Sequence, residues 1–202
     1  MFRIGVTGGI GSGKSTVCKI MEDYHIPVFY SDKVAKDLVH NDPEVRKKII
    51  DIFGEDIYPE GKFDTQALGA IVFKNKKKLA KLNNIIHPLV QERFEAWEKK
   101  LDAEGCRYIA MESALLIETK GHKKMDYVVV VTASEQERIK RTRERDGTTE
   151  EQVRAKINNQ IKEADRLTEA DFIITNEIGS GHEDFNLTGQ VLKMFIDIKD
   201  NY

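Results

Sequence analysis

The sequence predicts an α/β fold in which a parallel sheet is flanked by helices, and three features carry this prediction. Short apolar stretches with β-branched residues recur at 2–7, 27–30, 107–111, 127–131 and 172–175. Longer stretches with apolar residues at helical spacing lie between them. A run of glycines separates the first apolar stretch from the first helical one. Strands that alternate with helices pair in parallel, so we expect a parallel sheet covered by helices.

The first strand and the first helix are adjacent in the chain. Residues 2–7 are mostly apolar and end at glycines, which is typical of a buried parallel strand. Apolar side chains at helical spacing predict a helix over residues 14–24. Residues 27–30 then read as a second short strand. This order is the beginning of a strand–helix–strand unit.

A helical segment interrupts the strand pattern from residue 33 to about residue 100. Its apolar residues fall in clusters at helical spacing. Turn signals separate the clusters, at residues 41–43, 54 and 59–61. We therefore expect a core formed by residues 1–32 and 101–202, with residues 33–100 inserted after the second strand as a helical unit.

The strand pattern returns after the insertion. Residues 127–131 contain four consecutive valines and form the clearest strand of the chain. A long and highly charged helical segment, roughly residues 134–168, separates this strand from the one at 172–175. A final amphipathic helix is expected over about residues 182–199.

Composition and charge argue against several classes of protein. The chain has 202 residues, 33% of them charged, and a net charge of −2. Proteins that bind nucleic acid usually carry a basic excess, so this charge argues weakly against such a function. Two cysteines, Cys18 and Cys106, do not make a disulfide framework, and we expect both as buried or half-buried thiols. Without a visible signal segment or an apolar run near the roughly 18 residues of a membrane span, we expect a cytoplasmic monomer or weak homo-oligomer with no membrane partner.

The strongest motif lies between the first strand and the first helix. Residues 8–15 fit the P-loop pattern G-x-x-x-x-G-K-[ST], and Thr16 follows. Glycines let the backbone N–H groups converge on phosphate oxygens, and the following helix adds its positive end. Lys14 would bridge the β- and γ-phosphates of ATP, and Ser15 would ligate Mg²⁺. The candidate phosphate-binding residues are Gly8, Gly9, Gly11, Ser12, Gly13, Lys14, Ser15 and Thr16.

Other P-loop classes fit the chain less well. A GTPase needs a guanine-reading motif, and residues 176–179 lack both its lysine and its aspartate. The D-x-x-G pattern at residues 51–54 ends a helical stretch rather than a strand. A motor ATPase would show an apolar strand that ends in paired acids, but Ser113 follows Glu112. A small-molecule kinase remains.

Such a kinase needs a carboxylate and phosphate-binding cations besides the loop. Asp32 follows the second strand at the edge where open α/β sheets bind ligands, and it could accept the acceptor's proton or help to hold Mg²⁺. Position alone also allows it to cap the next helix. The basic cluster of Arg138, Lys140, Arg141, Arg143 and Arg145 could close over phosphates as a lid, with residues 147–150 at its tip. The acids mixed into it also allow a solvated charged helix.

Taken together, these segments resemble the dephospho-coenzyme A kinase family over nearly the whole chain. Residues 5–17 match the family's opening almost letter for letter. Further matching segments are 31–36, 53–57 with 61–64, 72–73 with 87–88, 115–118, 141–146, and Gln160 with 170–176. The P-loop alone is unspecific, whereas the ordered set at fitting distances is specific.

The resemblance implies an enzyme that moves the γ-phosphoryl of ATP to the ribose 3′-hydroxyl of dephospho-coenzyme A, with Mg²⁺. It implies a P-loop core, a coenzyme-binding region at 33–100 and a lid at about 138–168. Asp32 becomes the catalytic base beside Lys14, whereas Arg141, Arg145 and Asn176 become nucleotide contacts. Weaker acceptor-binding candidates are Lys36, His87, Leu115, Leu116 and Glu112. His87, in the pair His87-Pro88, could equally be a buried histidine that caps a helix end.

The chain departs from the family pattern on the acceptor side. Tyr30 replaces the first aspartate of the D-A-D segment, and Lys36 replaces its final arginine. Thr65 and Ala114 replace an arginine and a proline of the pattern. Two other readings stay open: a different P-loop kinase, acting on a nucleoside, a nucleoside monophosphate or a shikimate-like acid, and a nucleotide-dependent regulatory or nucleic-acid-binding protein that uses the basic cluster on backbone phosphates.

Overall fold

A computed structural model of the chain describes residues 1–73, 75–177 and 186–200, and it divides into two compact units. The first unit comprises Met1–Phe29 and the chain from Cys106 onward. The second unit comprises Tyr30–Gly105. The assignment of the second unit to coenzyme binding stays a prediction.

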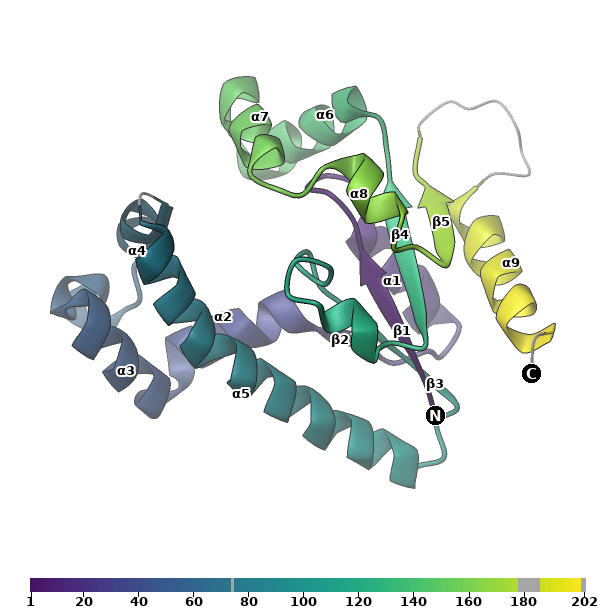
Figure 1. The fold of residues 1–202 in the computed structure, drawn as a ribbon, viewed down its shortest axis with the longest axis horizontal. Coiled ribbons are helices and arrows are strands. Elements are labelled where there is room, and N and C mark those ends of the chain that lie inside the picture. The colour runs from purple at the N-terminus through teal and green to yellow at the C-terminus, as the bar shows by residue number, and fades with distance from the viewer. Residues whose placement is uncertain (74, 178–185, 201–202) are drawn as a thin grey trace. The chain divides into compact units, whose positions relative to one another are not determined.

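The first unit is built on a five-stranded sheet within the described residues, in the order β2-β3-β1-β4-β5 (Figure 1). Strand β1 pairs in parallel with both β3 and β4, and β4 pairs in parallel with β5. The predicted parallel α/β fold is therefore confirmed. The strands are β1 (Phe2–Thr7), β2 (Val28–Tyr30), β3 (Tyr108–Glu112), β4 (Tyr127–Thr132) and β5 (Phe172–Thr175).

The central strands are buried because their side chains are apolar on both faces. Val128, Val129, Val130 and Val131 of β4 are all at most 5% exposed, as expected for the interior of a parallel sheet. Helix α1 (Lys14–Asp23) buries Val17, Cys18 and Met21, and it contacts helix α9 (Leu187–Asp200). Cys18 is buried, Cys106 is half-buried and both are free thiols, as predicted.

Three helices connect β4 to β5: α6 (Glu135–Asp146), α7 (Glu150–Asn158) and α8 (Glu163–Leu167) (Figure 1). Gly147 ends α6 in the left-handed conformation that favours glycine. Thr149 and Gln152 form a capping box that starts α7. The short connection therefore makes α6 and α7 a helical hairpin.

The second unit is helical throughout. Its elements are α2 (Ser31–Asn41), α3 (Pro43–Phe53), the short 3₁₀ helices η1 (Glu55–Ile57) and η2 (Pro59–Gly61), α4 (Thr65–Phe73) and α5 (Lys76–Ala103). Asp42 and Asn75 cap α3 and α5 through their side-chain oxygens. Its core consists of Leu38, Val39, Val45, Ile49, Ile57, Tyr58, Leu68 and Ile86. A further 3₁₀ helix, η3 (Gly121–Lys124), lies between β3 and β4 in the first unit.

Two alternative interpretations of the sequence were wrong. Asp32 is not a helix cap, because α2 begins one residue earlier and Tyr30 occupies the cap position. His87 does not cap a helix end, because α5 continues through both His87 and Pro88. The final helix begins at Leu187, and residues 182–185 of its predicted span lie outside the described residues. In the part of the chain that is described, no helix is both long and apolar enough to cross a membrane.

Candidate active site

The glycine-rich loop between β1 and α1 has a backbone that only glycines adopt readily. Gly11 and Gly13 have φ values of 76° and 98°, in the left-handed region where a Cβ is disfavoured. A Cβ on Gly13 would also lie 2.0 Å from the side-chain nitrogen of Asn176. Gly13 precedes α1 directly, so the N–H groups of the loop lie at the positive N-terminal end of that helix, where an anion is favoured.

Polar side chains of the loop fit a phosphate ligand. The Lys14 ammonium donates to the carbonyl oxygens of Gly8 and Gly9, at 3.0 and 3.3 Å, which holds the cation over the loop. Ser15 and Thr16 expose their hydroxyls at the first turn of α1. The Ser12 hydroxyl is fully buried and has no hydrogen-bond partner among the described residues. A bound triphosphate would bring acceptor oxygens to this group of donors.

Two predicted nucleotide contacts lie together beside the loop. The Asn176 side chain donates to the carbonyl of Ser12 at 2.9 Å, and the Arg141 guanidinium donates to the carbonyl of Asn176, also at 2.9 Å. Arg141 is further held by Glu137 at 3.4 Å. These hydrogen bonds join helix α6 and the end of β5 to the loop. Asn176 and Ser12 are separated by 164 positions in the sequence.

The loop is also held by two side chains for which the sequence predicted no contact with the loop. Gln160 accepts the backbone N–H of Ile10 at 2.9 Å, and Arg138 donates to the carbonyl of Ile10 at 3.0 Å. Arg138 is 6% exposed, so it is neither a lid cation nor part of a solvated face. No local signal distinguishes it from the other cations of its charged helix.

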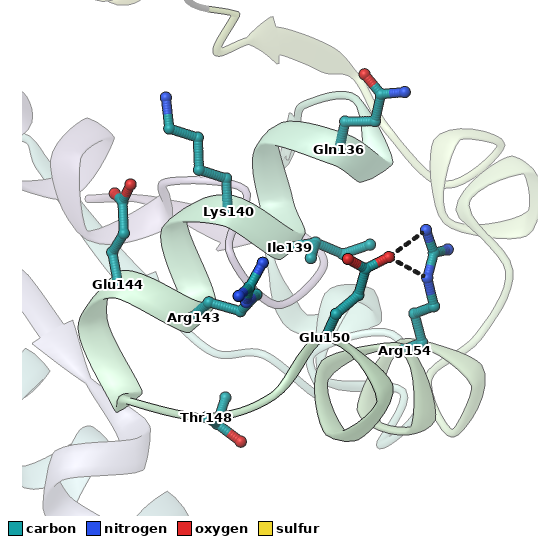
Figure 2. Close-up of a pocket in the computed structure, with 8 residues that line it drawn as sticks. All are labelled: Gln136, Ile139, Lys140, Arg143, Glu144, Thr148, Glu150 and Arg154. Atoms are coloured by element: carbon teal, nitrogen blue, oxygen red, sulfur yellow. Dashed lines mark hydrogen bonds and ion pairs between the residues drawn. The ribbon is translucent and has the colours of Figure 1, made fainter.

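Arg145 lies away from these contacts. Its side chain is 62% exposed and pairs with Asp146 at 2.6 Å, and this hydrogen bond raises the pKa of its guanidinium. Near it, a cleft of about 450 Å³ opens between α6 and α7 (Figure 2). The walls of this cleft include Lys140 and Arg143 of the predicted basic cluster, but none of the predicted nucleotide or acceptor contacts. The lining residues are Gln136, Ile139, Lys140, Arg143, Glu144, Thr148, Glu150 and Arg154. In Figure 2, Glu150 points toward Arg154 and pairs with it.

The three candidates around the end of β3 differ in exposure. Glu112 ends the strand opposite Val6 of β1 and is 9% exposed, so its carboxylate lies at the sheet edge from which the loop departs. Leu115 is 41% exposed and is available to a ligand. Leu116 is 1% exposed and lies against Gly5, so it is a core side chain and not an accessible acceptor contact.

The candidates in the helical unit are all exposed. Asp32 and Lys36 lie on α2, where Asp32 is in the first turn. His87 lies in the middle of α5, and partial loss of hydration lowers the pKa of its imidazole. None of these three side chains is needed to fill the core of its unit.

A metal ion at this site would take its ligands from both the loop and the bound nucleotide. Within the described residues there is no group of three or more histidine, cysteine or carboxylate side chains that could hold a metal ion. Ser15 offers one hydroxyl oxygen, and a hard cation such as Mg²⁺ commonly takes its remaining ligands from phosphate and water. The donor set therefore suits a metal that arrives with a nucleotide.

The strand, glycine loop, lysine and helix in this sheet define a P-loop kinase fold. A solved structure from Thermus thermophilus, TT1252, matches with a TM-score of 0.79 and 25% identity, covering 99% of this chain and 97% of that one. Shikimate kinase from Acinetobacter baumannii matches with a TM-score of 0.55 at 14% identity, which is a likeness of fold alone.

The particular family follows from sequence as well as fold. The family model described as dephospho-CoA kinase (CoaE) matches residues 2–181, and the chain belongs to that family. Dephospho-CoA kinases from Chlorobium luteolum and Bacteroides fragilis are 39% and 37% identical over 88% and 87% of this chain and 84% of each relative. A solved dephospho-CoA kinase from Campylobacter jejuni matches with a TM-score of 0.69 and 28% identity, over 99% of this chain and 98% of that one.

Proposed function

We propose that this chain transfers the γ-phosphoryl group of ATP to the ribose 3′-hydroxyl of dephospho-coenzyme A, which yields coenzyme A. The family match over residues 2–181 carries the proposal. The glycine loop supports it, because Lys14 and the N–H groups around it form a site for phosphate. The acceptor and its hydroxyl come from the family alone.

The loop residues have distinct parts in this proposal. The N–H groups around Gly11 and Gly13 bind the β-phosphate, and Lys14 exchanges its two carbonyl partners for phosphate oxygens as ATP binds. Ser15 offers its hydroxyl to Mg²⁺, which neutralises developing charge on the transferred group when it is bound. Arg141, held beside the loop by the carbonyl of Asn176, offers a guanidinium to the same charge.

The acceptor side rests on the second unit. Asp32 orients the 3′-hydroxyl and takes its proton late in the transfer, as a carboxylate general base does. Lys36 and His87 contribute to acceptor binding, together with Leu115 and Glu112 from the first unit. Residues 33–100 form the coenzyme-binding region in this assignment.

Lid closure is assigned to the distal part of the predicted lid segment. Arg138 and Arg141 are already bonded to the loop and to the end of β5, so the start of α6 belongs to the binding wall. Arg145, beyond it and exposed, is free to approach a nucleotide once it leaves Asp146. We further propose a cytoplasmic monomer or weak homo-oligomer with no nucleic-acid partner, which light scattering at several protein concentrations and a binding titration with duplex DNA test.

The deciding experiment is a coupled ADP-release assay with Mg-ATP. It compares dephospho-coenzyme A, adenosine, AMP, shikimate and no acceptor at equal concentrations. Fast release that requires dephospho-coenzyme A supports the proposal. Faster release with another acceptor moves the acceptor assignment to a different P-loop kinase, while release with no acceptor at all identifies an ATPase.

A further inference from the structure

Arg138 is a buried cation at the back of the P-loop. Its side chain leaves α6 and is 6% exposed, and its Nε donates to the carbonyl of Ile10 at 3.0 Å. Burial lowers the pKa of this guanidinium and the neighbouring Glu163 opposes the shift, so it stays a cation. A buried cation is costly unless its surroundings hold it in a defined geometry.

The guanidinium lies against a glycine of the loop. A Cβ on Gly9 would come within 2.2 to 3.0 Å of three atoms of the Arg138 head group. A Cβ on Gly11 would come within 2.3 Å of the Arg138 carbonyl and 2.6 Å of the Thr142 hydroxyl. One turn of α6 is thus packed directly against two glycines of the P-loop, with no room for a side chain between them.

A carboxylate holds Arg138 in this place. Glu163 lies 3.5 Å from Arg138, accepts the Thr132 hydroxyl at 2.6 Å, and pairs with Arg166 at 2.5 Å. Arg166 is 1% exposed and lies 4.0 Å from Glu118. Two buried cations and two half-buried carboxylates therefore form a network that ties β4 and α8 to the loop.

We propose that Arg138 is a positioning residue for nucleotide binding: it fixes the Ile10 peptide and covers Gly9, and so keeps the loop's N–H groups convergent before ATP arrives, while Glu163 fixes Arg138. The inference rests on the proposed function, because it assumes that the loop binds ATP. Arg138 donates to a loop carbonyl, so it acts on the phosphates through the backbone that binds them. A preformed loop does not need to be ordered at the cost of binding energy.

The test separates loop positioning from general stability. ATP affinity is measured by calorimetry without acceptor, and kcat and KM are measured for both substrates in Arg138→Met, Arg138→Lys and Glu163→Gln. We expect Arg138→Met to weaken ATP binding and raise KM for ATP about tenfold, with KM for dephospho-coenzyme A unchanged. Arg138→Lys keeps one donor for the Ile10 carbonyl but loses the planar guanidinium that also reaches Glu163. We therefore expect its ATP affinity to lie between those of Arg138→Met and the wild type. Glu163→Gln keeps an acceptor for Thr132 but loses the charge, and we expect a weakening of about threefold.

Arg107→Met is the matched control. Arg107 is an exposed arginine directly before β3, where its guanidinium lies over the Tyr108 ring, and we expect its loss to leave ATP affinity unchanged. A purely structural role for Arg138 would lower the melting temperature and the active fraction while ATP affinity and KM stay at wild-type values, and that result overturns the proposal. If Arg138→Met does not fold, unchanged ATP affinity in both Arg138→Lys and Glu163→Gln overturns it equally. A wild-type chain that binds ATP but does not use dephospho-coenzyme A loses only its acceptor assignment, since the ATP affinities of the variants still decide the role of Arg138.

Discussion

The two units hold their candidate residues in opposite ways. In the first unit, the loop is fixed by side chains from distant parts of the chain, through Arg138, Gln160 and Asn176. In the second unit, Asp32, Lys36 and His87 are exposed on helices that build the core with other residues, such as Leu38 and Ile86. The first unit presents a preorganised site, and the second presents side chains on a scaffold that does not depend on them.

This difference separates the consequences of substitution. A change in the loop alters its neighbours, so it should affect nucleotide affinity and stability together. A change at an exposed helical position should affect the reaction and leave the free energy of unfolding nearly unchanged. Four substitution experiments test this separation.

The largest effect is expected for Lys14→Met. The ammonium lies over the loop and is the cation best placed to meet phosphate oxygens, so its loss should lower kcat about a thousandfold. Steady-state kinetics with saturating dephospho-coenzyme A measure this loss. A variant that kept more than a tenth of wild-type kcat would show that the loop lysine is dispensable, and the P-loop assignment would then need another cation.

Asp32→Asn should lower kcat about a hundredfold or more, because the amide cannot accept the proton of the acceptor hydroxyl. ATP affinity and the melting temperature should stay at wild-type values, since Asp32 is exposed and makes no helix cap. Calorimetry, thermal unfolding and kinetics measure the three quantities.

The matched control for Asp32 is Asp37→Asn, an exposed aspartate on the same helix that accepts a hydrogen bond from Asn41. It should leave kcat unchanged. Glu112→Gln provides the contrast from the first unit, where the carboxylate is 9% exposed at the sheet edge. Normal turnover in Asp32→Asn together with a large loss in Glu112→Gln would transfer the base to Glu112.

A pair of glycine substitutions tests the two units directly. Gly13→Ala introduces a Cβ at φ 98° and within 2.0 Å of the Asn176 side chain, so we expect a loss of about 1–3 kcal/mol in stability as well as weaker ATP binding. Gly69→Ala lies inside α4 with nothing within 4 Å of the new Cβ, and it should gain about 0.5–1 kcal/mol. Urea unfolding measures both, and a Gly13→Ala variant as stable as wild type would show that the loop is not held as tightly as its contacts indicate.

The sequence alone predicted the sheet and the loop because their signals are local. Alternation of apolar strands and helices is visible within each window, and the spacing of the loop glycines identifies its phosphate site without knowledge of the rest. Asn176 was expected as a nucleotide contact only through the resemblance to a known family, and its hydrogen bond to the loop was not predicted. The burial of Arg138 was not predictable, because its helix carries acids and bases all round and its partner Ile10 lies 128 residues away.

The helical unit shows where local rules fail. Pro88 lacks the N–H that a helix interior needs, so the pair His87-Pro88 predicts a helix boundary. In the structure α5 runs from Lys76 to Ala103 across both residues, with Ile86 packed into the core of the unit. Burial of that apolar face outweighs one lost backbone hydrogen bond, and no short window of sequence contains this tertiary contribution.

The smallest expected effect concerns His87 and the pH dependence of stability. The pKa of its imidazole is lowered in the folded chain by lost hydration, so the unfolded chain binds the proton more readily. The folded state should therefore be most stable above the unfolded pKa of about 6.5 and should lose stability as pH falls through that value toward the lower folded pKa. His87→Gln should remove this part of the pH dependence and leave stability at pH 8 nearly unchanged, as urea unfolding between pH 5 and 8 can measure.

The matched comparison is His40→Gln, which changes an exposed histidine of α2 in the same unit. If His87→Gln and wild type follow the same curve between pH 5 and 8, the imidazole is as well hydrated in the folded chain as in the unfolded one, and His87 would be open to an acceptor phosphate without any cost of desolvation.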